Sequence, residues 1–290
     1  MNIKQQFEIL LDKEYKFSLI NEVNALKEQC ILENNTEYYN KCNLLISDIY
    51  IEHQNFDEAL NLLLKEQKKL DKVVFKNIYF DFLDRLIYLY INKRNYNVAL
   101  RYISQKEKLI DKNNNDVLNR LYLEYSYVYG NKNDLNKAEE YLLKILNNSP
   151  TIALQSVVYS NLTKICIDKE DVENAKKYLN ESLMYSNDHE GEVYNDYLLA
   201  KVCALEGKTN DALHLYESIF VSEDINSMTL SMMNDYLKLL NKLKKYNKSL
   251  LLMNKLSIFF NATTDYVILH DFLQNKLDYF IGIKDNTNII

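Results

Sequence analysis

Apolar and polar positions recur along this chain with a period of just under forty residues. The clearest marker is a small residue at the start of an apolar segment, and it occurs at Ala59, Ala99, Ala138, Ala175, Ala212 and Ser249, which are 40, 39, 37, 37 and 37 residues apart. Asn or Asp lies just before each segment, and the apolar positions that follow share one helical face, as in NFDEALNLLL at 55–64. Each marker therefore predicts the beginning of a capped, half-buried helix.

A second helix is predicted before each marker. The positions thirteen and nine residues earlier share a helical face and are mostly apolar or aromatic: Ile46 and Tyr50, Leu86 and Tyr90, Tyr125 and Tyr129, Leu162 and Cys166, Leu199 and Cys203, Tyr236 and Leu240. The position twelve earlier is small in four of six repeats, as expected where two helices approach closely: Ser47, Ile87, Ser126, Thr163, Ala200 and Leu237. The repeating unit is predicted to be a helical hairpin.

Composition agrees with long helices joined by tight turns. The 290 residues are 47% hydrophobic but include only four Gly and one Pro, too few for the turns of an all-β protein or a doubly wound sheet. A formal net charge of −6 makes nucleic acid an unexpected partner. The N-terminal residues have no signal-peptide pattern and no run of eighteen apolar residues occurs, so we expect a cytoplasmic protein without a membrane partner.

The hairpin spacing resembles the tetratricopeptide repeat (TPR). Pro150 lies twelve residues after Ala138, in the consensus proline position, and Asn161-Leu162-Thr163 stands where the consensus has Asn-Leu-Gly. Six hairpins cover residues 36–262, and residues 1–35 read as a degenerate seventh with Ser18 in the small position. The resemblance implies one domain over residues 1–290: an all-α, right-handed superhelix of about seven hairpins, with a capping helix and tail at 263–290. The tryptophan position of the consensus is not kept.

The period and both ends narrow the resemblance to the repeat domains of Gram-positive peptide-pheromone receptors, the Rap, NprR, PlcR, Rgg and PrgX group. The terminal stretches that carry it are QQFEILLDKEYKFSLINEVNALKEQ and LSIFFNATTDYVILHDFLQNKL. Residue 1 already lies in the repeat region, so we expect neither the helix-turn-helix of PlcR-like members nor the three-helix bundle of Rap members. The resemblance implies a regulator that binds a short signalling peptide and acts on a partner through a conformational or oligomeric change.

Such a ligand would lie against the first helix of each hairpin. Selected from the positions expected on that inner face, the candidate peptide-binding residues are Arg85, Tyr88, Arg120, Glu124, Tyr127, Asn161, Lys164, Tyr197, Lys201, Asn234 and Lys238. Asn can bind backbone amides, Arg and Lys can hold carboxylates, and Tyr offers flat apolar area with a polar tip. The receptor resemblance implies a backbone-clamping role for Asn161 alone. The hairpin register predicts Lys164, Tyr197 and Lys201 beside it, with Arg120 and Glu124 on its other side.

Other readings stay open. The same polar positions are typical of a solvated face, and the chain can equally be a scaffold that docks a partner protein or the sensory module of a longer transcriptional regulator. The C-terminal helix is apolar on more than one side, so we expect it either to fold onto the last hairpin or to pair in a homodimer.

Nothing in the sequence indicates catalysis, a cofactor or a metal. The four cysteines lack metal-ligand spacing, and Cys166 and Cys203 fall in core positions. The four histidines have no HExxH partner, and EGKTND at 206–211 is an inter-helix turn with Gly207 at the helix end. We therefore expect a non-enzymatic protein.

Overall fold

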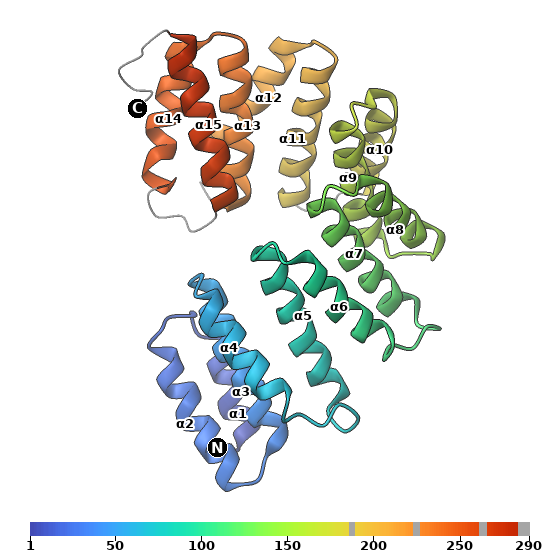
Figure 1. The fold of residues 1–290 in the computed structure, drawn as a ribbon, viewed down its shortest axis with the longest axis vertical. Coiled ribbons are helices and arrows are strands. Elements are labelled where there is room, and N and C mark those ends of the chain that lie inside the picture. Colours follow the sequence, from blue (N-terminus) through green and yellow to red (C-terminus); the bar gives the residue numbers. More distant parts are fainter. Residues whose placement is uncertain (186–188, 223–226, 261–265, 284–290) are drawn as a thin grey trace. The chain divides into compact units, whose positions relative to one another are not determined.

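The computed structural model describes residues 1–185, 189–222, 227–260 and 266–283, and this part of the chain contains fifteen α-helices and no strand (Figure 1). The predicted all-α class is confirmed. The chain divides into two compact units, Met1–Lys144 and Ile145–Ile290. We describe each unit by itself, so the right-handed twist and the single domain over 1–290 stay predictions.

The helices alternate as first and second members of hairpins. In the first unit they are α1 (Ile3–Leu11), α2 (Leu19–Leu32), α3 (Thr36–Glu52), α4 (Phe56–Gln67), α5 (Lys76–Asn92), α6 (Tyr96–Glu107) and α7 (Asn115–Asn131). Helix α8 (Leu135–Asn147) runs past the unit boundary. The second unit contains α9 (Ile152–Asp168), α10 (Val172–Tyr185), α11 (His189–Leu205), α12 (Thr209–Ser222), α13 (Ser227–Lys242), α14 (Tyr246–Phe260) and α15 (Tyr266–Gly282).

The helices begin and end where the positions of the small residues predicted. In all six hairpins the first helix ends seven residues before the small residue, and the second begins three residues before it. The six small residues are 0–1% exposed, and the position twelve earlier is buried in every hairpin. Of the predicted core aromatics, Tyr50, Tyr90 and Tyr129 are only partly buried, because a Tyr ring can pack while its hydroxyl reaches water. The resemblance to tetratricopeptide hairpins thus holds for the fold.

One turn geometry joins the two helices of every hairpin. The residue five positions before the small residue has left-handed backbone, with φ of 58° at Gln54, 55° at Arg94, 62° at Asn133, 59° at Glu170, 78° at Gly207 and 55° at Lys244. The next backbone N–H donates to the carbonyl five residues back at 2.8–2.9 Å, as at Asp171 and Cys166. This is the Schellman arrangement that ends a helix. The predicted position of Gly207 at a helix end is confirmed.

The predicted side-chain caps form in only some of the hairpins. The carboxylates of Asp134 and Asp171 accept backbone N–H groups three residues on, at 3.3 and 3.1 Å. Asn55 and Asn95 occupy the cap positions of α4 and α6 without a cap hydrogen bond, so the cap prediction was wrong there. Their ψ of 63° and 62° is smaller than the ψ of 80° at Asn35, 99° at Asn114 and 158° at Thr151, whose side chains do accept a first-turn N–H.

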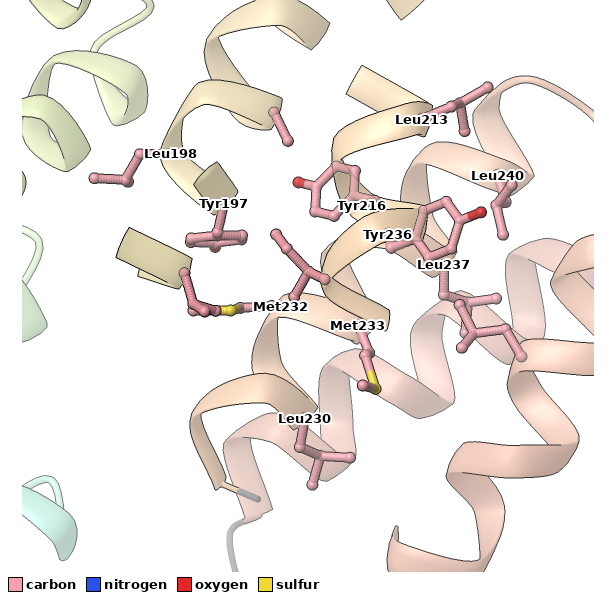
Figure 2. Packing of buried hydrophobic residues seen from close by; sticks show 14 of the residues in the cluster. Tyr197, Leu198, Leu213, Tyr216, Leu230, Met232, Met233, Tyr236, Leu237 and Leu240 are labelled. Atoms are coloured by element: carbon pink, nitrogen blue, oxygen red, sulfur yellow. The ribbon is translucent and has the colours of Figure 1, made fainter. Parts of the chain in front are cut away.

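The core of the second unit is continuous from α9 to α15. Side chains of α11, α12 and α13 interdigitate in Figure 2, where Tyr216 and Tyr236 stack with ring centroids 5.3 Å apart. Helix α15 packs against α13 and α14, burying Phe272 and Tyr279, and the Tyr279 ring meets the Tyr246 ring edge-on at 5.8 Å. The expectation that the C-terminal helix folds onto the last hairpin is therefore confirmed, although its predicted start at Thr264 lies outside the described residues.

Candidate functional site

The candidate site in the first unit lies on the exposed side of α5 and α7. Helical spacing places Arg85 and Tyr88 on α5, and Arg120 and Tyr127 on α7, away from the second helices, whereas Glu124 of α7 contacts the second helix α6. Tyr88 and Tyr127 are 46% and 56% exposed, and Arg120 is also exposed. Large aromatic side chains left this open on a first helix supply flat apolar area with a polar tip.

An open pocket of about 300 Å³ lies between α3 and α5. Asp48 and Ile51 of α3 and Asp84, Arg85 and Tyr88 of α5 line it. Arg85 bridges the two helices, because its Nε and Nη2 donate to the two carboxylate oxygens of Asp48, each at 2.7 Å. This fork is the strong bidentate form of an ion pair, and it fixes the Arg85 side chain in the pocket wall. Arg85 Nη1 donates to the backbone carbonyl of Asp81 at 3.0 Å.

Beside the pocket, Lys106 of α6 joins the two first helices. Its ammonium donates to Asp84 of α5 at 2.5 Å and to Glu124 of α7, while its side chain is only 8% exposed. The second carboxylate oxygen of Glu124 is buried, and no described residue forms a hydrogen bond with it. Sequence analysis missed Lys106, because the search was limited to the first helices.

Burial shifts the protonation of the carboxyl groups here. Desolvation raises the pKa of Glu124 to about 7, although the Lys106 ammonium opposes the shift. Burial also raises the pKa of Asp81, an effect that the Arg85 guanidinium only partly offsets. Carboxyl groups with a raised pKa are those that a nearby cation would stabilise.

The predicted residues of the second unit lie on α9, α11 and α13, and their surroundings differ from one another. Lys164 and Lys238 are exposed. Tyr197 is 7% exposed, and its hydroxyl donates to Asp235 at 2.6 Å, a carboxylate that also accepts from Lys201 at 3.0 Å. Burial and the Asp235 charge raise the pKa of Tyr197. Tyr197, Lys201 and Asp235 thus form one internal cluster across α11 and α13.

Asn161, the residue expected to clamp a ligand backbone, is partly exposed on α9. Its side-chain amide donates to the Val157 carbonyl of its own helix at 2.8 Å. Asn92 and Asn131 make the same bond four residues back, both at 2.9 Å. The expected neighbours Arg120 and Glu124 belong to the first unit, so their place beside Asn161 stays a prediction.

The structure places Asn234 under the C-terminal helix. Asn275 of α15 donates from its side-chain amide to the Asn234 side-chain oxygen at 2.7 Å and to the Asn234 carbonyl at 3.1 Å. Asn241 donates to the Asn275 carbonyl at 2.8 Å. Asn234 and Asn275 are each 5% exposed. Helix α15 thus takes up the hydrogen-bonding groups of Asn234 that a ligand was expected to use.

Comparisons with known proteins add little to these geometric observations. No family model matches the chain, and no curated protein matches it. A solved structure described as "Functional Characterization of Pseudomonas Aeruginosa pilF" is similar, with 16% sequence identity, a TM-score of 0.49, and coverage of 78% of this chain and 94% of that chain. At this level of similarity we take no function from it, and the proposals below rest on the residues of this chain.

The described residues contain neither a candidate membrane span nor a candidate metal cluster. Across residues 1–185, 189–222, 227–260 and 266–283, no helix is both long and apolar enough to span a bilayer. The same ranges contain no group of three or more His, Cys, Asp or Glu side chains placed to hold a metal ion. The four cysteines are buried and no disulfide joins them, and Cys166 and Cys203 lie in the core as predicted.

Proposed function

We propose that this protein binds a short peptide, or the extended tail of a partner protein, along the exposed sides of its first helices. The observation that carries the proposal is the open pocket between α3 and α5, next to a face that exposes Tyr88, Arg120 and Tyr127. Rigid aromatic rings and fixed ion pairs on regular helices form a preorganised surface, which costs little conformational entropy on binding.

In the second unit, the residues that support the proposal are Asn161 and Lys164 of α9 and Lys238 of α13. Asn161 keeps a side-chain oxygen that can accept an amide N–H, and the two lysines are exposed. We leave Tyr197, Lys201 and Asn234 out of direct ligand contact, since internal partners already occupy their polar groups. Binding would act by favouring one arrangement of the hairpins, as expected of a regulator.

The test begins with an array of nine-residue peptides of varied sequence, from which a binder is taken for calorimetric titration. Arg120→Ala should weaken a binder that occupies the first unit, and Asn161→Ala a binder that occupies the second, each by roughly five- to a hundredfold, because each leaves ligand groups unpaired. The matched controls are Arg101→Ala and Asn180→Ala, which change exposed residues of the same type on the second helices α6 and α10. The proposal would be contradicted if the control variants bound the peptide as weakly as the test variants, or if the test variants bound it as tightly as the wild type.

A specific observation also favours a second candidate function, a scaffold that docks a folded partner. Helix α14 exposes a group of large apolar side chains: Leu250 41%, Leu251 72%, Ile258 72% and Phe259 38%. Exposed apolar groups of this kind are typical of protein interaction sites. Leu251→Lys and Ile258→Lys together should abolish capture of such a partner without changing peptide binding. Homodimerisation through the C-terminal helices stays a prediction, which sedimentation of the intact chain would test.

A further inference from the structure

The pocket between α3 and α5 combines apolar walls with charged groups. Ile51 contributes aliphatic surface, and Tyr88 contributes a ring that is nearly half exposed. A volume of about 300 Å³ is at the lower end of the range for small-molecule sites, enough for a single long side chain. The sign of the charge that such a side chain carries can be inferred from the hydrogen bonds around the pocket.

The cations at the pocket are already paired within the chain. Arg85 gives two donors to Asp48 and a third to the backbone of Asp81. Lys106 gives donors to Asp84 and Glu124. An anionic ligand, which the sequence analysis expected Arg85 to hold, would have to displace Asp48 from its bidentate bond. The arrangement therefore disfavours a carboxylate in this pocket.

The carboxyl groups around the pocket, in contrast, outnumber the cationic groups. Asp48, Asp81, Asp84 and Glu124 surround Arg85 and Lys106, and Asp81 lies one helical turn before Arg85 on α5. In the described residues, neither a hydrogen bond nor an ion pair occupies the side-chain oxygens of Asp81. The Asp84 side chain is 46% exposed, and only its Oδ1 atom accepts a hydrogen bond from Lys106. Partly desolvated carboxylates without a full complement of donors favour an incoming cation.

We propose that this pocket holds a cationic side chain, lysine or arginine, of the bound peptide or partner tail. The aliphatic stem of that side chain lies along Ile51 and the Tyr88 ring, and its charged head reaches the carboxylates of Asp81 and Asp84. The Tyr88 face adds a cation–π attraction. This inference rests on the proposed function, since it names the chemistry that the same site selects.

The experiment uses three fluorescently labelled pools of nine-residue peptides with identical mixed composition except at every third position, which is Lys, norleucine or Glu. Anisotropy titration with the intact protein should show the Lys pool binding about tenfold more tightly than the norleucine pool, with the Glu pool weakest. Norleucine keeps the aliphatic stem and removes only the charge. Equal affinities for the Lys and norleucine pools, or a preference for Glu, would overturn the inference.

Two substitutions test whether Asp81 and Tyr88 cause the preference for lysine over norleucine. Asp81→Asn removes the carboxylate that lacks a side-chain partner, and Tyr88→Leu removes the ring face while keeping apolar bulk. Each should reduce the Lys-over-norleucine ratio several-fold. Glu58→Gln, which removes an exposed negative charge on α4, is the control and should keep the full ratio. A ratio that survives both Asp81→Asn and Tyr88→Leu would place the cation site elsewhere and overturn the assignment.

The three pools also separate this inference from the proposed function. If none of the pools binds, the peptide-binding function itself is wrong. If all three bind alike and Arg120→Ala weakens them alike, peptide binding stands and the cation-selective pocket is wrong. Melting curves of each variant confirm that affinity changes do not come from unfolding.

Discussion

At the scale of single residues, the polar groups that matter most lie at a register position that is apolar in half of the six hairpins. Seven residues after the small residue, the second helix has Ile145, Ile219 or Leu256 in three hairpins, but Glu66, Lys106 or Ser182 in the others. All six positions are buried. Buried polar groups require partners, and the structure supplies them from the first helices.

Lys106 and Ser182 show that a polar residue at this register position can form either ion pairs or neutral hydrogen bonds. Lys106 binds Asp84 of its own hairpin and Glu124 of the next. Ser182 lies 2.7 Å from Ser160 of its own hairpin and donates to Asn195 of the next at 2.8 Å. A polar residue at a core register position was the signal by which the sequence could have revealed both clusters.

The contact between Lys106 and Glu124 leads to a prediction about how stability depends on pH. The folded chain keeps the Glu124 proton up to a pH of about 7, whereas an ordinary glutamate loses it near 4.5. The folded state therefore binds more protons than the unfolded state between these values, so the contribution of Glu124 to the free energy of unfolding falls as pH rises from about 5 to about 7. The loss is at most about 3 kcal/mol.

Glu124→Gln isolates this effect, because glutamine resembles the protonated acid and does not titrate. Urea unfolding at intervals between pH 5 and pH 8 should show that the wild type loses stability relative to Glu124→Gln as pH rises. Asp81, whose pKa is also raised, is present in both proteins and cancels in the difference. A constant difference across this range would mean that Glu124 has an ordinary pKa.

At the scale of elements, the turn inside each of the six hairpins requires left-handed backbone, yet glycine occupies this position in only one of the six. Non-glycine residues pay a steric cost of about 1 kcal/mol in this conformation. Glu170, with φ of 59°, is exposed, and its turn makes the same backbone bonds as the turn at Gly207. Glu170→Gly should therefore raise the free energy of unfolding by about 1 kcal/mol, and urea denaturation would measure it.

Gly207→Ala is the reciprocal variant and should lower stability by a similar amount. A Cβ atom at Gly207 would meet no other atom within 4 Å, so its cost comes from backbone conformation alone. If both substitutions change stability in the same direction, the turn geometry is not what limits stability here.

The sequence predicts the helix ends of a hairpin more directly than it predicts the contacts of surface residues, for a physical reason. A small residue at a helix crossing is constrained by close packing, so the position of Ala175 or Ala212 fixes the register of a whole hairpin. An exposed polar residue such as Asn161 has no such constraint, and its amide bonds its own helix. Covering of Asn234 by α15 is a contact over 41 residues that no local pattern encodes.

At the scale of the molecule, the main packing pairs among the described helices join near neighbours along the chain. In the second unit they are α9 with α10 and α11, α10 with α11, α11 with α12, α12 with α13, α13 with α14 and α15, and α14 with α15. In repeat proteins, such near-neighbour packing makes stability a sum of hairpin terms and interface terms. A local defect should therefore loosen its own hairpin and the adjoining one, while distant hairpins keep their stability.

Ala175→Leu tests this locality. Ala175 is 0% exposed where α9 and α10 cross, so three added carbon atoms overpack the crossing and should cost about 1–3 kcal/mol. Hydrogen exchange should accelerate in α9, α10 and α11 but stay at the wild-type rate in α14 and α15, which share no contact with α10 among the main packing pairs. Ala153→Leu, at an exposed position of α9, is the control and should leave every helix unchanged. Uniform acceleration throughout the second unit would instead mean that its hairpins unfold as one cooperative body, and a ligand bound at one hairpin would then stabilise all of them equally.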